Sequence, residues 1–133
     1  MRQITLRTER RTQLIEITEL VEDVVRRSEN GASAALVYVP HTTAGVTINE
    51  DIDPKLARDI EAAMERIVGD EWRWEHTDAD GPNAPSHMRA SLMSPEVLVP
   101  LDDGRLALGR YQGIFFCEFD GPRERKVYVT TLH

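Results

Sequence analysis

The sequence predicts an α+β fold in which a mainly antiparallel, sandwich-like β-sheet carries two to three helices in a single compact domain. Short β-compatible runs occupy both ends of the chain, two amphipathic helical stretches lie between them, and tight turns separate the C-terminal strands at hairpin spacing. At 133 residues, of which 41% are hydrophobic, the chain has the size of one domain, spanning residues 1–133.

The first half of the chain alternates strands with a helix. Apolar residues at Ile4 and Leu6, and then at Leu14, Ile15 and Ile17, predict two opening strands. A helix over Glu19–Glu29 follows, with Thr18 as its N-cap and Asn30-Gly31 at its end. Two more strands are expected at Ala34–Val39, which Pro40 ends, and at Val46–Ile48.

The second helix has the strongest pattern in the chain. Asp53-Pro54 supplies an N-cap and a first-turn proline, and Leu56, Ile60 and Ile67 recur at helical spacing before Gly69. Further on we expect a strand at Trp72–Trp74, a short helix at Ala84–Met93, strands at Val97–Val99, Leu106–Leu108, Ile114–Phe119 and Val127–Val129, and turns at Asp102–Gly104 and Asp120–Arg123.

Composition excludes several classes of partner. The chain has 16 Lys and Arg against 23 Asp and Glu, a net charge of −7, which repels nucleic acid and anionic membranes but leaves room for a small phosphorylated substrate in a locally positive cleft. No run approaches the roughly 20 apolar residues of a membrane span. The single cysteine, Cys117, lies in an apolar strand and is expected to be a core residue. We therefore expect a cytoplasmic protein.

Three of the four histidines lie in turn-like surroundings. His76 and His87 bound a twelve-residue segment with two aspartates and two prolines, and His41 follows the buried strand that ends at Pro40. Three imidazoles with one open position make a catalytic metal site, for which zinc is the first candidate. Their spacings match no local ligand motif, and a single histidine is more often a surface or hydrogen-bonded residue. His133 is expected to lie at a frayed end.

Carboxylates and one arginine could complete the site. Asp78 and Asp80 could bind the metal or orient the imidazoles, Glu50 could act as a base or ligand near His41, and Glu118 and Arg123 flank a tight turn that presents a guanidinium to an anion. The alternatives are an acidic loop, a helix entry and a hairpin salt bridge respectively.

The order of these motifs resembles the YjbQ-like family of secondary thiamine-phosphate synthases. The residues that carry the resemblance are Pro40–Gly45, Asn49–Asp51, His76–Leu92, Leu106–Gly109 and Glu118–Arg123, so it covers nearly the whole chain as one YjbQ-like domain. One departure is Tyr111 before Gln112, where the family commonly has tryptophan.

The resemblance implies a homotrimer and a cleft where His41, His76 and His87 hold a divalent metal, zinc first, or magnesium with a diphosphate substrate. The activity it implies joins a hydroxymethylpyrimidine diphosphate to a thiazole phosphate and releases pyrophosphate, with Glu50, Glu118 and Arg123 as the surrounding catalytic candidates. Two alternatives stay open: a metal-stabilised trimeric ligand-binding or assembly protein without dedicated catalysis, and a metal-assisted hydrolase of a small phosphorylated molecule.

Overall fold

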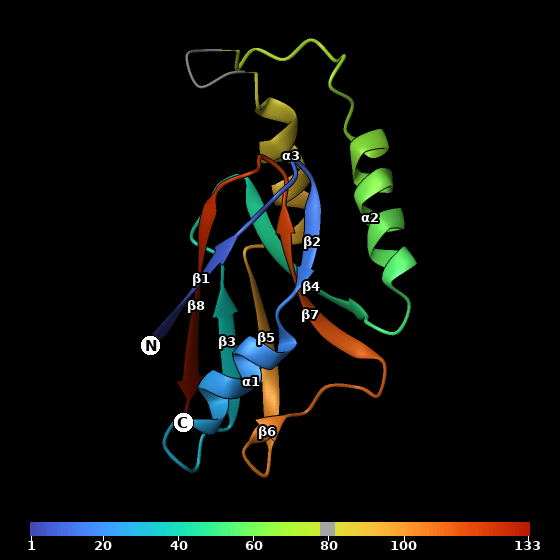
Figure 1. Cartoon of the computed structure of the whole chain (residues 1–133). Coiled ribbons are helices and arrows are strands. Elements are labelled where there is room, and N and C mark those ends of the chain that lie inside the picture. The colour runs from blue at the N-terminus through green and yellow to red at the C-terminus, as the bar shows by residue number, and fades with distance from the viewer. Residues whose placement is uncertain (78–81) are drawn as a thin grey trace.

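Two antiparallel sheets pack face to face in the computed structural model, which describes residues 1–77 and 82–133 (Figure 1). The five-stranded sheet has the order β1-β8-β3-β5-β6 and the three-stranded sheet the order β2-β7-β4. In chain order the elements are β1 (Arg2–Arg7), β2 (Gln13–Glu16), α1 (Thr18–Arg26), β3 (Ala34–Tyr38), β4 (Ala44–Glu50), α2 (Pro54–Ile67), α3 (Ala84–Met93), β5 (Glu96–Asp102), β6 (Arg105–Leu106), β7 (Gln112–Glu118) and β8 (Glu124–Leu132). The predicted α+β class is confirmed.

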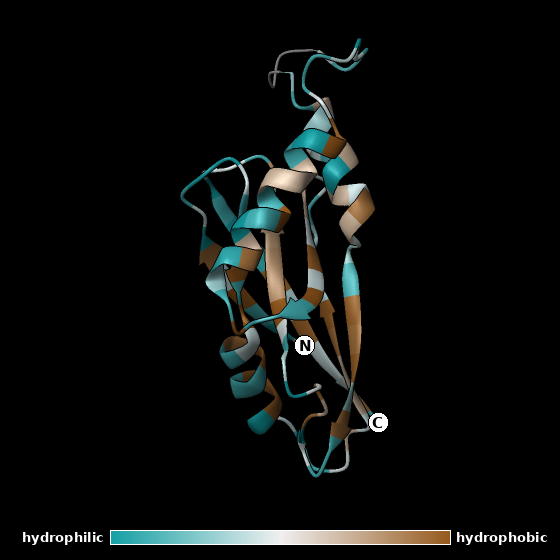
Figure 2. Cartoon of the chain, turned by 90° about the vertical axis from the view of Figure 1, so that its right-hand side faces the viewer, coloured by the Kyte–Doolittle hydropathy of each residue, from teal (hydrophilic) through white to brown (hydrophobic). Residues whose placement is uncertain are grey.

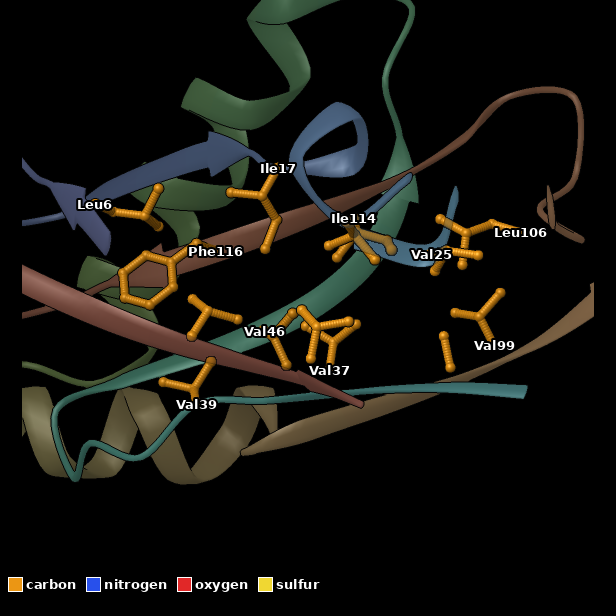
Figure 3. Close-up of a cluster of buried hydrophobic side chains, with 14 of the residues drawn as sticks. Leu6, Ile17, Val25, Val37, Val39, Val46, Val99, Leu106, Ile114 and Phe116 are labelled. Carbon is orange, nitrogen blue, oxygen red and sulfur yellow. The ribbon is translucent and has the colours of Figure 1, made fainter. Parts of the chain in front are cut away.

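Strand β7 is buried on both of its faces, and this explains its continuous apolar sequence. Ile114 and Phe116 face the core between the two sheets, together with Val37, Val46 and Val99 (Figure 3). The alternate residues Phe115 and Cys117 face a second apolar cluster under α2 and α3, so Cys117 is the core residue that its surroundings predict. The molecule thus has three layers: the five-stranded sheet, the three-stranded sheet and two helices.

Helices α1 and α2 are amphipathic, and they carry both hydrophilic and hydrophobic surfaces in Figure 2. The Asp53 side chain accepts a hydrogen bond from the Lys55 N–H at 2.9 Å, which confirms the predicted cap of α2. In α1 the predicted cap is wrong. Thr18 lies inside the helix, and its hydroxyl instead accepts the Ile114 N–H at 2.8 Å and ties α1 to β7.

Other predictions also differ from the structure. The first helix ends at Arg26 rather than Glu29, and β6 ends at Leu106 rather than Leu108. Trp72–Trp74 forms a turn rather than a strand, because the Trp74 N–H donates to the Trp72 carbonyl at 2.9 Å within the segment itself. Strand β8 is longer than expected, since it pairs with β1 on one side and β3 on the other. The helix over Ala84–Met93 is confirmed at both ends.

No helix in the described ranges is both long enough and apolar enough to cross a membrane.

Candidate functional site

A cavity of about 620 Å³ lies at the end of the sandwich where β8 begins and α3 starts. It brings together His41 from the β3–β4 connection, His76, His87 on α3, and Arg123 and Arg125 beside and within β8. Its remaining lining residues are Pro40, Thr42, Thr43, Asn83 and Asp120. We call this the histidine–arginine cavity.

The His41 side chain provides a hydrogen-bond acceptor for β8 beyond the point where its neighbour β3 ends. Strands β3 and β8 pair as far as Tyr38 and Tyr128, so the same register would place Lys126 opposite Pro40. There the His41 Nε2 accepts the Lys126 N–H at 2.9 Å. The neutral ring therefore carries its proton on Nδ1. Burial and the nearby charge of Arg125 hold the pKa of His41 below its usual value, which favours this neutral form.

His76 and His87 meet edge to face. Their ring centroids lie 5.2 Å apart with an interplanar angle of 82°. His87 lies in the first turns of α3, and its backbone N–H donates to the Asn83 carbonyl at 3.3 Å. The two rings present several nitrogen atoms to one cavity.

Glu118 is fully buried and fully hydrogen-bonded. Its Oε1 accepts from the Thr8 hydroxyl and Arg125 Nε, both at 2.8 Å, and its Oε2 accepts from Arg125 Nη2 and the backbone N–H groups of Phe119 and Asp120. Burial opposes ionisation, but the hydrogen bonds from Arg125, Asp120 and Thr8 outweigh it and lower the pKa of Glu118. The carboxylate thus holds Arg125 in place, and its lone pairs are committed.

Arg125 is the principal site residue that the sequence did not reveal. Besides Glu118, its Nη2 contacts the Thr43 hydroxyl at 2.7 Å, so the guanidinium is fixed in the cavity wall. A signal was present: Arg125 has the same strand parity as the buried Val127 and Val129, and a charge on the buried face of a strand needs a partner.

The turn after β7 supplies Arg123. Its Nε and Nη2 donate to Asp120, at 2.8 Å to the carbonyl and 2.9 Å to Oδ2. Asp120 Oδ2 also accepts from Asn83 Nδ2 at 3.1 Å, which joins this turn to the start of α3. The predicted hairpin salt bridge is present, and the same arginine lines the cavity.

Glu50 lies elsewhere. It ends β4 and pairs with Gln112, whereas His41 precedes the start of the same strand. Seven strand residues span about 20 Å, so the expected position near His41 is not what the structure shows. Tyr111 lies at the same far end, where its carbonyl accepts the Asp51 N–H at 3.0 Å, and Arg110 lies 5.4 Å from its ring centroid.

The histidines do not have the geometry of a three-ligand metal centre. Among residues 1–77 and 82–133, no three His, Cys, Asp or Glu side chains are grouped closely enough to hold an ion. His41 also has its Nε2 lone pair engaged and a proton on Nδ1, which leaves no nitrogen for a metal in this arrangement. Asp78 and Asp80 lie outside the described residues.

A second cleft, of about 640 Å³, adjoins the first through Asn83 and Asp120, which line both. Its other walls include Trp72, Trp74 and Arg73. We call it the tryptophan cleft. The sequence pattern predicts a strand for these tryptophans and indicates no place for them in the site.

Comparison with known proteins points to a single family. A family model described as UPF0047 protein YjbQ-like matches residues 2–133. The UPF0047 protein YugU of Bacillus subtilis is 40% identical over 135 residues, covering 99% of this chain and 98% of that protein, and a UPF0047 protein of Methanocaldococcus jannaschii is 38% identical over 127 residues, covering 96% and 90%.

Solved structures agree. An uncharacterized conserved protein of the yjbq/upf0047 family from Clostridium acetobutylicum superposes with a TM-score of 0.93 at 39% identity, covering 99% of this chain and 100% of that one. A YbjQ-like protein of unknown function from Sulfolobus solfataricus gives a TM-score of 0.91 at 33% identity, covering 98% and 94%.

Proposed function

The chain belongs to the UPF0047, YjbQ-like family, and the names of the relatives compared above state no function. From the geometry of the cavity we propose that the protein binds the diphosphate group of a small molecule. The reaction proposed for the site is the thiamine-phosphate synthase type of condensation, with pyrophosphate as the leaving group.

The observation that carries the proposal is the concentration of cationic and N–H donor groups in one cavity of an acidic chain. Two guanidinium groups and three imidazoles line about 620 Å³, although the net charge of the chain is −7. A volume of this size accommodates a small organic diphosphate. Arginine is suited to phosphate because its planar fork donates two parallel hydrogen bonds.

The arginines are held so that part of each guanidinium stays free. In the described part of the chain, the Nη1 atoms of Arg123 and Arg125 have no hydrogen-bond partner, while Nε and Nη2 of each are bound by Asp120 and by Glu118 respectively. Donors fixed before the ligand arrives need little reorganisation, and this favours stabilisation of charge that develops during a reaction.

In the proposed condensation, a ring nitrogen of the thiazole phosphate forms a bond to the methylene carbon of the pyrimidine diphosphate. The bond from that carbon to the diphosphate oxygen breaks, and pyrophosphate leaves with the electron pair. Arg123, Arg125 and His87 would stabilise the negative charge on the leaving group. Glu118 acts as a positioning residue for Arg125, and Glu50 has no part in this cavity.

The proposed mechanism needs no resident metal. His41 contributes a neutral ring whose Nδ1–H can donate, rather than a lone pair for zinc. A magnesium ion that enters with the diphosphate is a separate proposal, and titration with and without magnesium tests it.

Calorimetric titration with pyrophosphate, in chelator and then in excess magnesium, tests the binding. We expect saturable binding in chelator and a loss of roughly tenfold or more in affinity for Arg123→Gln, because a charge-assisted hydrogen bond contributes about 1.5–3 kcal/mol. Arg27→Gln is the matched control: Arg27 also contacts an aspartate, Asp23, on the surface, but lies just after the end of α1, outside the cavity lining.

Two results would contradict the proposal. One is no pyrophosphate binding under either condition, and the other is equal loss in Arg123→Gln and Arg27→Gln. Binding only with magnesium would show that the ion, rather than the two arginines, neutralises the charge of the diphosphate. Binding without turnover of pyrimidine diphosphate and thiazole phosphate would favour the ligand-binding alternative, and release of inorganic phosphate from simple phosphate esters would favour the hydrolase.

A further inference from the structure

The tryptophan cleft is a second compartment next to the histidine–arginine cavity. Asn83 and Asp120 line both, and the 3.1 Å hydrogen bond between their side chains forms the boundary. A ligand that crosses this boundary would place one end among the arginines and histidines and the other against the tryptophans.

The two tryptophans form an ordered platform. Their rings stack with centroids 5.5 Å apart and an interplanar angle of 16°. Trp74 is fixed by its Nε1–H, which donates to the Gly69 carbonyl at 3.0 Å, and by its backbone N–H, which donates to the Trp72 carbonyl. Trp72, by contrast, is 59% exposed.

An exposed indole on a cleft wall is suited to an aromatic ligand. Stacking on an indole that is already ordered requires little further loss of side-chain freedom, and an aromatic pair adds stabilisation beyond simple area burial. Arg73 and Arg11 line the same cleft, but Asp70 and Asp120 balance their charge, and Asp70 is paired with Arg11 at 2.7 Å. The aromatic surface is therefore the distinguishing feature of this cleft. If the two tryptophans only stabilised a surface loop, nothing would require them to line a cleft beside the phosphate-binding groups.

We propose that the tryptophan cleft binds the planar aromatic ring of a ligand whose diphosphate occupies the histidine–arginine cavity, with Trp72 as the stacking surface. This rests on the proposed function for the position of the diphosphate. It adds a ring-binding subsite and makes Trp72 a specificity-determining residue.

Intrinsic fluorescence reports on this subsite alone, because Trp72 and Trp74 are the two tryptophans of the chain. Three probes separate the contributions: pyrophosphate, benzyl diphosphate and its saturated counterpart cyclohexylmethyl diphosphate. We expect benzyl diphosphate to change the tryptophan emission and to bind about tenfold more tightly than the other two.

Trp72→Leu should abolish this preference while leaving pyrophosphate affinity unchanged, with Trp74 still present as a reporter. Tyr111→Leu, which removes a similarly exposed aromatic residue at the far end of the sandwich, should retain the preference.

The two proposals fail in different ways. Equal affinities for benzyl and cyclohexylmethyl diphosphate, or a benzyl preference that survives Trp72→Leu, would overturn the ring subsite whether or not pyrophosphate binds. If pyrophosphate does not bind, the proposed function fails, and Trp72-dependent binding of benzyl alcohol would then still support the aromatic subsite.

Discussion

His41 and Glu118 show how a residue with reactive chemistry can be committed to structure. The Nε2 of His41 accepts the Lys126 N–H. Both carboxylate oxygens of Glu118 accept hydrogen bonds, from Thr8, Arg125 and the backbone of the following turn. From sequence alone such residues are interpreted as ligands or bases, because the sequence shows the residue type but not its hydrogen-bond partners. What remains available for chemistry is the guanidinium that Glu118 holds.

Glu118→Gln is expected to lower the free energy of unfolding by about 3–5 kcal/mol at neutral pH, because it leaves Arg125 buried without a counter-charge. The folded pKa of Glu118 lies below the unfolded value of about 4.3, so its ionised form stabilises the protein above that pH, and this contribution is lost as pH falls further. Denaturant unfolding across pH should therefore show a flatter acid limb in the variant.

The control for this prediction is Glu124→Gln, an exposed carboxylate on β8. It should change stability by less than about 0.5 kcal/mol. Equal effects of the two substitutions would show that the buried pair contributes nothing specific.

Strand β4 and helix α3 set the position of His87. Any Cβ on Gly45 would lie 2.7 Å from the Ser94 carbonyl oxygen and 3.1 Å from Met93 Cβ, and the same carbonyl accepts the Val46 N–H at 2.9 Å. Glycine at this position lets the end of α3 approach the strand, so the helix that carries His87 is fixed from its far end.

Gly45→Ala should destabilise the protein by about 1–3 kcal/mol and weaken pyrophosphate binding, since the backbone of Ser94 must move. Gly69→Ala is the matched control, because its Cβ would meet the flexible side chain of Glu71. Thermal melts and calorimetry measure both effects. An unchanged melting temperature for Gly45→Ala would refute the close-approach argument.

The sequence predicted elements well where local chemistry decides them. Asp53-Pro54 marks the start of α2, and an apolar run identifies β7, because caps and buried strands have local signatures. It failed for the full length of β8, which depends on pairing with the distant strands β1 and β3. It also failed at Trp72–Trp74, where an alternating pattern indicated a strand but the segment turns back on itself. Glu50, nine residues from His41 in sequence, lies at the opposite end of a strand.

At the scale of the whole molecule, the outer face of the five-stranded sheet exposes three large apolar side chains. Leu98 is 59% exposed, Tyr38 43% and Leu132 41%, and their strand parity places them opposite the inward-facing Val37, Val99 and Val129. Helices α2 and α3 pack on the other sheet (Figure 1). Apolar patches of this kind often mark subunit contacts, so this face is the candidate contact in the homotrimer that the family resemblance implies.

Sedimentation equilibrium tests the trimer. We expect a mass of three times the 15.1 kDa chain and dissociation by Leu98→Arg. Leu20→Arg, on the exposed side of α1, should leave the mass unchanged. A monomeric parent would contradict the trimer, and a trimeric Leu98→Arg variant would place the interface elsewhere.

The most direct test of the central claim is a crystal structure of the protein with pyrophosphate, grown in the presence of zinc and recorded at the zinc absorption edge. We predict phosphate oxygens within hydrogen-bond distance of Arg123 and Arg125, with His41 Nε2 still accepting the Lys126 N–H. An anomalous peak about 2 Å from nitrogens of His41, His76 and His87 would contradict this account and establish the three-histidine zinc site in its place.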